Sequence, residues 1–262
     1  MQDVLYQIKK YSHFLMKSTN KHGVHSPFVF DLITKCFNQK TALEKMQILG
    51  EYRSELAQNK TTITVTDFGA GSRVFKNNQR MVATILKHVS VSKKQSSLLI
   101  RLVAYLNTKN ILEIGTSLGV GTLSLALGNK DAVITTLEGC LETLKIPKNS
   151  LKKYVLNTIN FIGGEFSTTL PKVLKDKKYD MIYFDGNHKK EATIQYFEQC
   201  LTAVHNETFF IFDDIYWSDE MTEAWEYIKN HDKVSLTIDT FNLGFVFFRK
   251  EQFEKEHFVV RR

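Results

Sequence analysis

A glycine-rich loop separates an apolar, strand-like segment from an apolar helical pattern in ILEIGTSLGVGTLSLAL, residues 111–127. Its glycines, Gly115, Gly119 and Gly121, have the spacing GxxxGxG, which differs from the GxGxxG of dinucleotide-binding proteins. Glycines let a ligand approach the backbone closely, and the amino end of the following helix offers N–H groups and a positive dipole. The sequence therefore predicts a loop that binds a nucleotide-like cofactor.

An acid at the end of the next predicted strand supports this interpretation. Glu138 follows Gly115 by 23 residues, where a carboxylate can accept hydrogen bonds from both ribose hydroxyls of an adenosine. A second glycine-rich segment, VTDFGAGSR at residues 65–73, is followed by polar residues and by no second strand or ribose acid. We therefore interpret residues 65–73 as a structural turn or as a lip over the active site.

Short apolar runs predict the strands that position the loop. They lack polar alternation, which indicates strands buried on both faces of a parallel sheet. The last two are joined by three residues, too few for a parallel crossover, and should therefore form an antiparallel hairpin. The predicted fold is a doubly wound α/β domain. The predicted strands are residues 110–115, 133–138, 159–163, 179–184, 209–213, 235–239 and 243–249.

The first part of the chain is organised differently. Residues 1–95 contain helical patterns, one of them at about residues 41–59, and a strand-like TTITVTDFG, but no alternation of strands and helices. We therefore predict two parts, a mainly helical N-terminal extension over residues 1–95 and the α/β domain over residues 96–262. The extension is expected to cover the substrate side of the domain, because its apolar SPFVFDLI needs a partner surface.

The composition indicates a globular protein of the cytoplasm. Of 262 residues, 43% are hydrophobic, enough for a sizeable core. Cys36, Cys140 and Cys200 form no CxxC pair, which favours a reducing compartment, and no run is long enough for a signal peptide or a membrane span. The net charge of +7 permits an anionic partner such as RNA, but the lysines are scattered, which favours ordinary solvated surfaces.

From about residue 95 to residue 249 the chain resembles the class I S-adenosylmethionine-dependent methyltransferases, in the O-methyltransferase branch that includes catechol O-methyltransferase. The resemblance implies a seven-stranded, mostly parallel sheet whose last strand is antiparallel. It also implies S-adenosylmethionine as cofactor. The motifs that carry it are ILEIGTSLGVGTLSLA, TLEGC, FIGGEFSTTLP, YDMIYFDGNH and FFIFDDIYW.

The resemblance also implies roles for individual residues at the cofactor site. The methionine end of the cofactor would be held by Glu113 and by the loop, and the ribose by Glu138. Gly164 and Glu165 would lie beside the adenine. The loop residues concerned are Gly115, Thr116, Ser117 and Gly119.

At the ends of the fourth and fifth predicted strands, the resemblance implies catalytic and metal-binding residues. Asp185, Asp213 and Asp214 would hold a divalent cation such as Mg²⁺, although the family often has Asn at the last position. Asp185 would also contact the cofactor. His188 stands where catechol enzymes have a lysine base, and this difference makes catechols doubtful acceptors. The sequence around His188 is instead similar to that of a related group with a DGxH motif. His188 would then be the catalytic base.

Methyl transfer explains why these residue types are needed. A histidine can take the acceptor's hydroxyl proton, and a divalent cation could instead lower the pKa of that hydroxyl. The alternative for Asp213 and Asp214 is structural, with one acid capping a helix and the other pairing with a lysine. His22 and His25, in KHGVHSPF, could line the substrate side or be structural.

Three aromatic residues follow the fifth predicted strand. Trp217 could wall the pocket or belong to the core, and Trp225 and Tyr227 are predicted to be helix core.

The predicted function is S-adenosylmethionine-dependent transfer of a methyl group to a hydroxyl of a small-molecule acceptor. One alternative is methylation of a tRNA or other RNA hydroxyl, since the net charge is positive. Another is a non-catalytic cofactor-binding protein or a nicotinamide enzyme. A homodimer is included among the predicted partners, and the sequence does not identify the acceptor.

Overall fold

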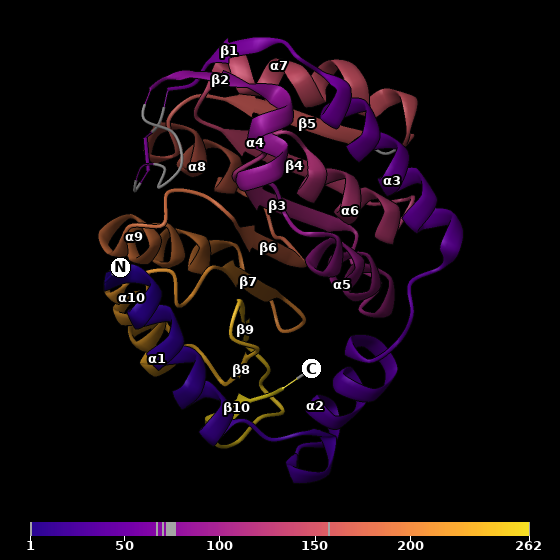
Figure 1. Ribbon diagram of the computed structural model, residues 1–262. Helices are drawn as coiled ribbons and strands as arrows, with labels where there is room; N and C mark the ends of the chain where they lie inside the picture. The colour runs from indigo at the N-terminus through magenta and orange to yellow at the C-terminus, as the bar shows by residue number, and fades with distance from the viewer. Residues whose placement is uncertain (1, 67, 70, 72–76, 157, 262) are drawn as a thin grey trace. The chain divides into compact units, whose positions relative to one another are not determined.

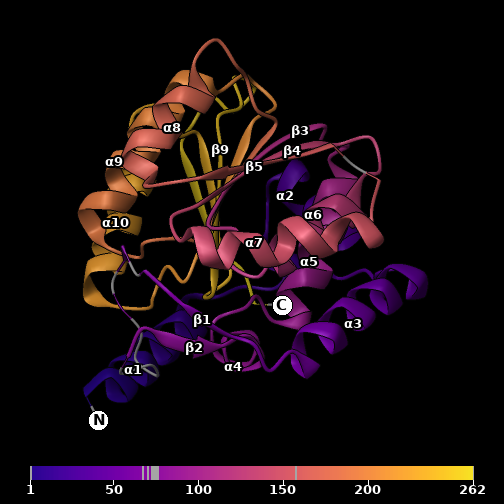
Figure 2. The same cartoon turned by 90° about the horizontal axis from the view of Figure 1, so that it is seen from above.

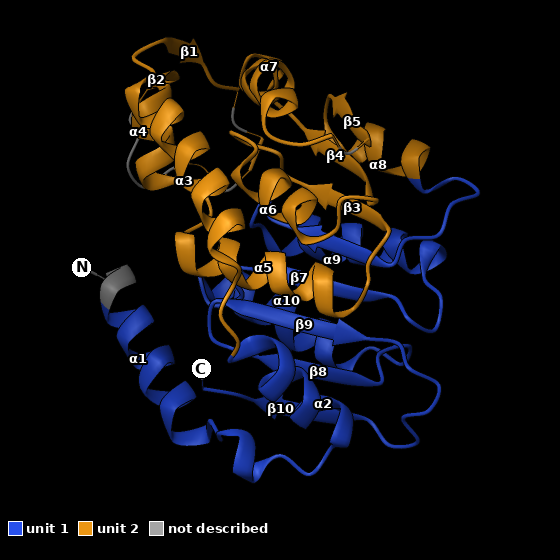
Figure 3. Ribbon diagram, turned by 90° about the vertical axis from the view of Figure 1, so that its right-hand side faces the viewer, with its two compact units in different colours: residues 1–38, 174–262 blue, residues 39–173 orange. Residues whose placement is uncertain are grey.

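The structure is a computed structural model that describes residues 2–66, 68, 69, 71, 77–156 and 158–261 (Figure 1). These fall into two compact units, coloured separately in Figure 3. Unit 1 comprises residues 1–38 and 174–262, and unit 2 comprises residues 39–173. The first 38 residues of the predicted extension therefore belong to unit 1, and the rest belongs to unit 2.

Unit 2 contains three parallel strands in the order β3–β4–β5. Helices α3 and α5 pack on α6, and α7 packs on β4 and β5. The antiparallel pair β1–β2 stands apart from these strands. The elements of this unit are α3 (Leu43–Gln58), β1 (Thr62–Thr64), β2 (Gln79–Met81), α4 (Val82–His88), α5 (Lys93–Tyr105), β3 (Asn110–Ile114), α6 (Val120–Gly128), β4 (Val133–Glu138), α7 (Leu141–Ser150), β5 (Thr158–Gly163) and α8 (Phe166–Leu174), which ends at the unit boundary.

Unit 1 contains five strands in the order β10–β8–β9–β7–β6. β6 and β7 are parallel, β9 is antiparallel to both β7 and β8, and β10 is parallel to β8. The β8–β9 pair is the predicted hairpin. The elements of this unit are α1 (Gln2–Lys17), α2 (Pro27–Leu32), β6 (Met181–Phe184), α9 (Lys190–Cys200), β7 (Phe209–Asp213), α10 (Asp219–Asn230), β8 (Leu236–Asp239), β9 (Leu243–Phe247) and β10 (Glu256–Val259).

The predicted fold class is confirmed. All seven predicted strands are present as β3 to β9, in a mostly parallel central sheet with helices on both sides and a helical N-terminal extension. The prediction of seven strands was incomplete, because β10 adds a further strand beside β8. Short turns of other helix types, such as the π-helical turn Ile33–Phe37, follow several α-helices.

Aromatic side chains show how helices cover both faces of the unit 1 sheet. On one face, Phe197 of α9 contacts Phe210 and Phe212, and Trp225 of α10 contacts Phe212. Helices α9 and α10 lie side by side there (Figures 1 and 2). On the other face, Phe28 contacts Phe247 and Phe37 contacts Phe245. This double cover explains why the strands are apolar throughout.

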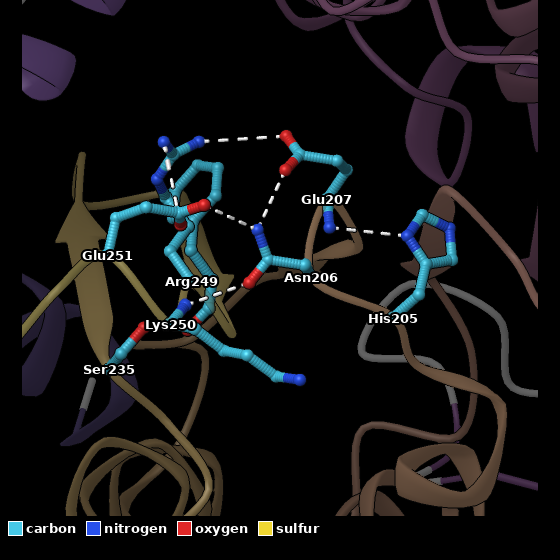
Figure 4. Close-up of polar contacts among 8 residues, drawn as sticks. His205, Asn206, Glu207, Ser235, Arg249, Lys250 and Glu251 are labelled. Carbon is cyan, nitrogen blue, oxygen red and sulfur yellow. Dashed lines mark hydrogen bonds and ion pairs between the residues drawn. The ribbon is translucent and has the colours of Figure 1, made fainter.

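A polar cluster fastens the turn before β7 to the segment after β9 (Figure 4). The Asn206 side-chain amide donates hydrogen bonds to Glu207 and Glu251, both at 2.8 Å, and its oxygen accepts from the Lys250 N–H at 2.9 Å. Arg249 forms ion pairs with the same two acids and lies over the Phe28 ring. The cluster lies where β7 begins, whereas the predicted acids lie where β7 ends.

Burial corrects one prediction about helix α10. Trp225 is 1% exposed, as predicted for a core residue, but Tyr227 is 45% exposed and donates a hydrogen bond to Glu198. The three cysteines are buried and unpaired with one another. Among the described residues, none of the helices has the length and apolarity that crossing a membrane requires.

Candidate functional site

The glycine-rich loop follows β3 and uses backbone conformations that favour glycine. Gly115 has a φ of 112° and Gly119 a φ of 74°. A side chain at Gly119 would have its Cβ 2.5 Å from Cβ of Pro147, so this position also lacks space. The loop is further held by Tyr52 of α3, which is fully buried and donates a hydrogen bond to the Leu118 carbonyl at 2.6 Å. The loop is therefore a tightly packed, fixed structure.

The Glu138 side chain connects the end of β4 to this loop. One carboxylate oxygen accepts the Ser117 N–H at 2.8 Å, and the other accepts the Cys140 N–H at 2.9 Å. The Gly164 N–H, which follows β5, donates to the Glu138 carbonyl at 2.9 Å. The structure therefore brings the loop, Glu138 and Gly164 together at the carboxyl ends of β3, β4 and β5, where doubly wound proteins bind their ligands.

Glu113 lies beneath the loop and is fully buried. Its Oε2 accepts hydrogen bonds from the hydroxyls of Thr122, at 2.5 Å, and Thr136, at 2.6 Å. Burial raises the pKa of Glu113 to about 7, and the nearby charge of Glu138 adds to that, while the two hydroxyls oppose it. Among the described residues no hydrogen-bond donor reaches Oε1. Burial therefore disfavours the charged form of Glu113, and a positive ligand group nearby would stabilise that form.

The remaining predicted cofactor residue and the second glycine-rich segment lie near this end of unit 2. Glu165 is exposed, and its carbonyl accepts hydrogen bonds from the first turn of α8. Phe68 packs against Gly139, directly after Glu138, so a Cβ at Gly139 would lie 2.8 Å from the Phe68 ring. Within the predicted turn or lip, residues 67, 70, 72 and 73 lie outside the described residues.

The predicted acids of unit 1 cluster at the carboxyl ends of β6 and β7. Tyr183 donates a hydrogen bond to Asp185 at 3.1 Å, and the Asp213 carboxyl is hydrogen-bonded to both side chains. Burial raises the pKa of Asp213 to about 8, and the charge of Asp214 adds to it. Asp214 has a φ of 54°. Asp213 therefore binds its proton more tightly than an exposed aspartate does.

His188 faces the same acids. Its Nε2 lies 3.8 Å from Asp185 Oδ1, and its side chain is 26% exposed. Burial lowers the pKa of His188, although the charge of Asp214 partly opposes this effect. The imidazole is therefore neutral at pH 7 and able to accept a proton.

Among the described residues, no group of three or more His, Cys, Asp or Glu side chains is placed to hold a metal ion. The acids expected to bind Mg²⁺ instead share hydrogen bonds with one another. Carboxylate oxygens are the ligands that Mg²⁺ prefers, and the role of these acids as its ligands stays a prediction.

Three other residues were predicted to have a role at the site: His22, His25 and Trp217. His22 and His25 are exposed, in the segment between α1 and α2. Trp217 is half-buried, and its N–H donates to the Asp214 carbonyl at 2.8 Å, so it shares the turn that follows β7. The roles predicted for all three remain predictions.

Sequence reasoning missed the hydroxyl groups that support the loop. Tyr52, Thr122, Thr136 and Tyr183 each form a hydrogen bond to the loop or to a predicted site acid. Thr122 follows Gly121 directly and Thr136 precedes Glu138 by two positions. A polar residue within an apolar segment, at such short range from a motif, was the available signal.

Comparison with known proteins assigns the chain to a family. The family of O-methyltransferases matches residues 72–243, and the chain belongs to this family. A protein of Arabidopsis thaliana, provisionally named as a caffeoyl-CoA O-methyltransferase, is 27% identical over 149 residues, which cover 56% of this chain and 63% of the plant protein. The chain thus matches less than two thirds of that relative's length.

Solved structures have the same fold. A methyltransferase of Podospora anserina bound to S-adenosylhomocysteine (SAH) has a TM-score of 0.60 at 16% identity, covering 87% of this chain and 97% of that one. An O-methyltransferase of Bacillus cereus in complex with SAH has a TM-score of 0.55 at 19% identity, covering 89% and 99%. At these identities the likeness concerns the fold.

Proposed function

We propose that this protein is an S-adenosylmethionine-dependent O-methyltransferase that acts on a hydroxyl of a small-molecule acceptor. Family membership and the SAH-bound relatives support this proposal. The observation that carries it is the Glu138 carboxylate, which joins the glycine-rich loop to the end of β4. In doubly wound nucleotide-binding proteins, an acid about 20 residues after the glycine-rich loop binds the ribose.

The residues of unit 2 fit the proposed cofactor. The buried Glu113 carboxylate has one oxygen without a donor among the described residues, which suits the cationic methionine end. Each Glu138 oxygen accepts a backbone N–H, and because a carboxylate has about four lone-pair sites it can accept more than two hydrogen bonds, such as those from ribose hydroxyls. Gly119 has no room for a side chain, which keeps the loop close-packed. Gly164 and Glu165 would border the adenine.

The chemistry then needs a positioned acceptor and a base. Bound S-adenosylmethionine supplies an electrophilic methyl group on a sulfonium. His188 would take the proton of the acceptor hydroxyl, because its imidazole is neutral at pH 7. Its side chain is 26% exposed, so an acceptor can reach it. Asp185, 3.8 Å from His188, would stabilise the imidazolium that forms.

Cofactor binding is tested by titrating SAH into the protein and measuring the heat of binding. Glu138→Ala should weaken SAH by about 1.5–3 kcal/mol, because charge-assisted hydrogen bonds to the ribose are lost. The matched control is Glu142→Ala, an exposed acid on the next helix whose contact is with Lys145. Unchanged affinity in Glu138→Ala would place the ribose elsewhere, and no SAH binding by the unaltered protein would contradict the proposal.

Catalysis is tested with caffeoyl-CoA as the first hydroxyl acceptor, followed by other small phenols. If His188 is the base, His188→Ala should lower turnover by roughly 10²–10⁴-fold. Turnover with EDTA and with added Mg²⁺ tests the predicted metal, and Asp213→Ala should then mimic chelation. Unchanged turnover under both the histidine substitution and chelation would refute the assignment of these residues.

A further inference from the structure

Strand β5 leaves one edge of the unit 2 sheet open. It is the last strand, beyond β4 (Figure 3). The Gly164 N–H donates to the Glu138 carbonyl of β4, and the backbone groups of successive residues in a strand point in opposite directions. The N–H and carbonyl groups of Ile159, Phe161 and Gly163 therefore point away from β4. Within the described residues, these groups have no hydrogen-bond partner.

β5 lacks the features that usually protect an edge strand. Such edges are commonly protected by charged residues, proline or a β-bulge. The strand TINFIG, residues 158–163, contains no charged residue and no proline, and its register with β4 runs without interruption. Two apolar side chains near it are exposed: Leu156, two positions before β5, is 100% exposed, and Leu141 of α7 is 59% exposed. An open, apolar edge of this kind is suited to pairing with another strand.

A second copy of β5 fits this edge in the antiparallel orientation. If Phe161 of one copy lies opposite Phe161 of the other, Ile159 of each copy lies opposite Gly163 of the other. All three positions are then hydrogen-bonded pairs, in which the N–H and carbonyl groups of both residues are used. The two half-buried Phe161 rings become neighbours on one face of the sheet, which is a favourable cross-strand pair.

The contact between Gly163 and α7 explains how the exposed Leu141 would be covered. A Cβ at Gly163 would lie 2.3 Å from Leu141 Cδ2, so Leu141 lies directly over the glycine. Ile159 of the second copy would stand opposite Gly163, on the same face of the sheet, because directly paired residues share a face. Its side chain would therefore pack against Leu141 and remove apolar surface of both residues from water.

Charges on either side of β5 favour the antiparallel orientation. Lys152, in the helical turn before β5, and Glu165, shortly after it, are both exposed. Antiparallel pairing brings the beginning of one strand beside the end of the other, so the lysine of each copy approaches the glutamate of the other, and opposite charges attract. Parallel pairing would place like charges side by side. The strand itself is uncharged and adds no repulsion.

We propose that β5 is a dimerisation edge, at which two copies of this chain pair through antiparallel β5 strands related by a twofold axis. Twofold dimers are the commonest oligomers, and they require a self-complementary surface. The pattern of outward backbone groups, which is symmetric about Phe161, provides such a surface. The inference goes beyond the proposed function and does not depend on it, because it rests on groups outside the glycine-rich loop.

Sedimentation velocity of the full chain, from about 1 μM to about 1 mM, measures association in the range expected of a small interface. The unaltered protein should change from one chain to two as its concentration rises. Phe161→Lys and Phe161→Glu should each stay monomeric, because like charges then lie opposite one another. An equimolar mixture of these two variants should form a dimer, because lysine then lies opposite glutamate. Val133→Lys, at a 39% exposed position of β4, is the matched control and should still dimerise.

The results decide whether the edge pairs with itself. An unaltered protein that is monomeric throughout would leave the edge to a strand of another molecule and would overturn the inference. Dimers of either Phe161 variant alone, or no dimer in their mixture, would overturn the pairing at Phe161.

Circular dichroism checks that each variant is folded. If the Phe161 variants do not fold, Ile159→Pro is used, because it removes an N–H that points outward, and proline is tolerated at such positions of edge strands. Ile159→Pro should abolish the dimer, and a folded Ile159→Pro that still dimerises would overturn the inference.

Discussion

Replacing Glu113 by Gln should make the stability of the protein less dependent on pH. The pKa of Glu113 is raised from 4.5 to about 7 by burial, so the folded state binds the proton more tightly than the unfolded state. Its stabilising contribution is therefore full below pH 4.5 and is lost as the pH rises through 7. The glutamine is neutral throughout, and its side-chain oxygen can still accept the hydroxyls of Thr122 and Thr136.

The size of the effect follows from the two pKa values. Their difference corresponds to about 3 kcal/mol in total, most of which falls between pH 5 and pH 9. Urea unfolding at both pH values measures it. The free energy of unfolding of the unaltered protein should fall by about that much more than that of Glu113→Gln over this interval.

Comparing Glu113→Gln with the unaltered protein cancels the contribution of other titrating groups to the pH dependence of the unfolding free energy. Asp213, whose pKa is raised to about 8, contributes a dependence of the same sign to both proteins and cancels. Glu142→Gln, at an exposed acid, is the matched control and should follow the unaltered protein. A difference between Glu113→Gln and the unaltered protein that is the same at pH 5 and pH 9 would refute the reasoning.

Three further substitutions have expected outcomes. Gly119→Ala should lower the unfolding free energy by at least about 2 kcal/mol, because φ is 74° and its Cβ would meet Pro147; thermal unfolding measures this, and an unchanged midpoint would contradict it. Tyr52→Phe should cost about 1–2 kcal/mol and weaken SAH, because the Leu118 carbonyl loses its buried donor; retained stability in urea would count against it. Asn206→Ala should cost about 1 kcal/mol without changing SAH affinity, since its contacts lie where β7 begins; calorimetry with and without SAH checks both parts.

Local patterns predicted most of the fold, and long-range pairing explains the part that was missed. Strands β3 to β9 are contiguous apolar runs, so their positions could be predicted from the sequence. β10 has the sequence EHFV, which is short and half polar, and it forms a strand because the edge of β8 is available to it. Such pairing depends on tertiary structure and leaves no periodic signal.

The same contrast holds for the site. Glu138 and the loop glycines were predicted from spacing, and the structure brings them together. The Thr136 hydroxyl was missed because a threonine in an apolar strand also has the β-branched shape that strands favour, so its position close to the motif is an ambiguous signal. The prediction that Tyr227 is buried was wrong for a geometric reason. Tyr227 is two positions from Trp225, and residues at that spacing lie on different faces of a helix.

The pairing of β10 covers an edge of the sheet that would otherwise be open. The Thr19 N–H donates to the Val259 carbonyl, and the Thr19 carbonyl accepts the Arg261 N–H, so a segment after α1 closes part of the outer edge of β10. β10 in turn covers the edge of β8. A chain shortened to end at residue 250 would leave the backbone groups of β8 unpaired along that edge. Such an edge is a template for strands of other molecules, so this shortened protein should form aggregates that the full chain avoids, even where its cofactor loop is intact.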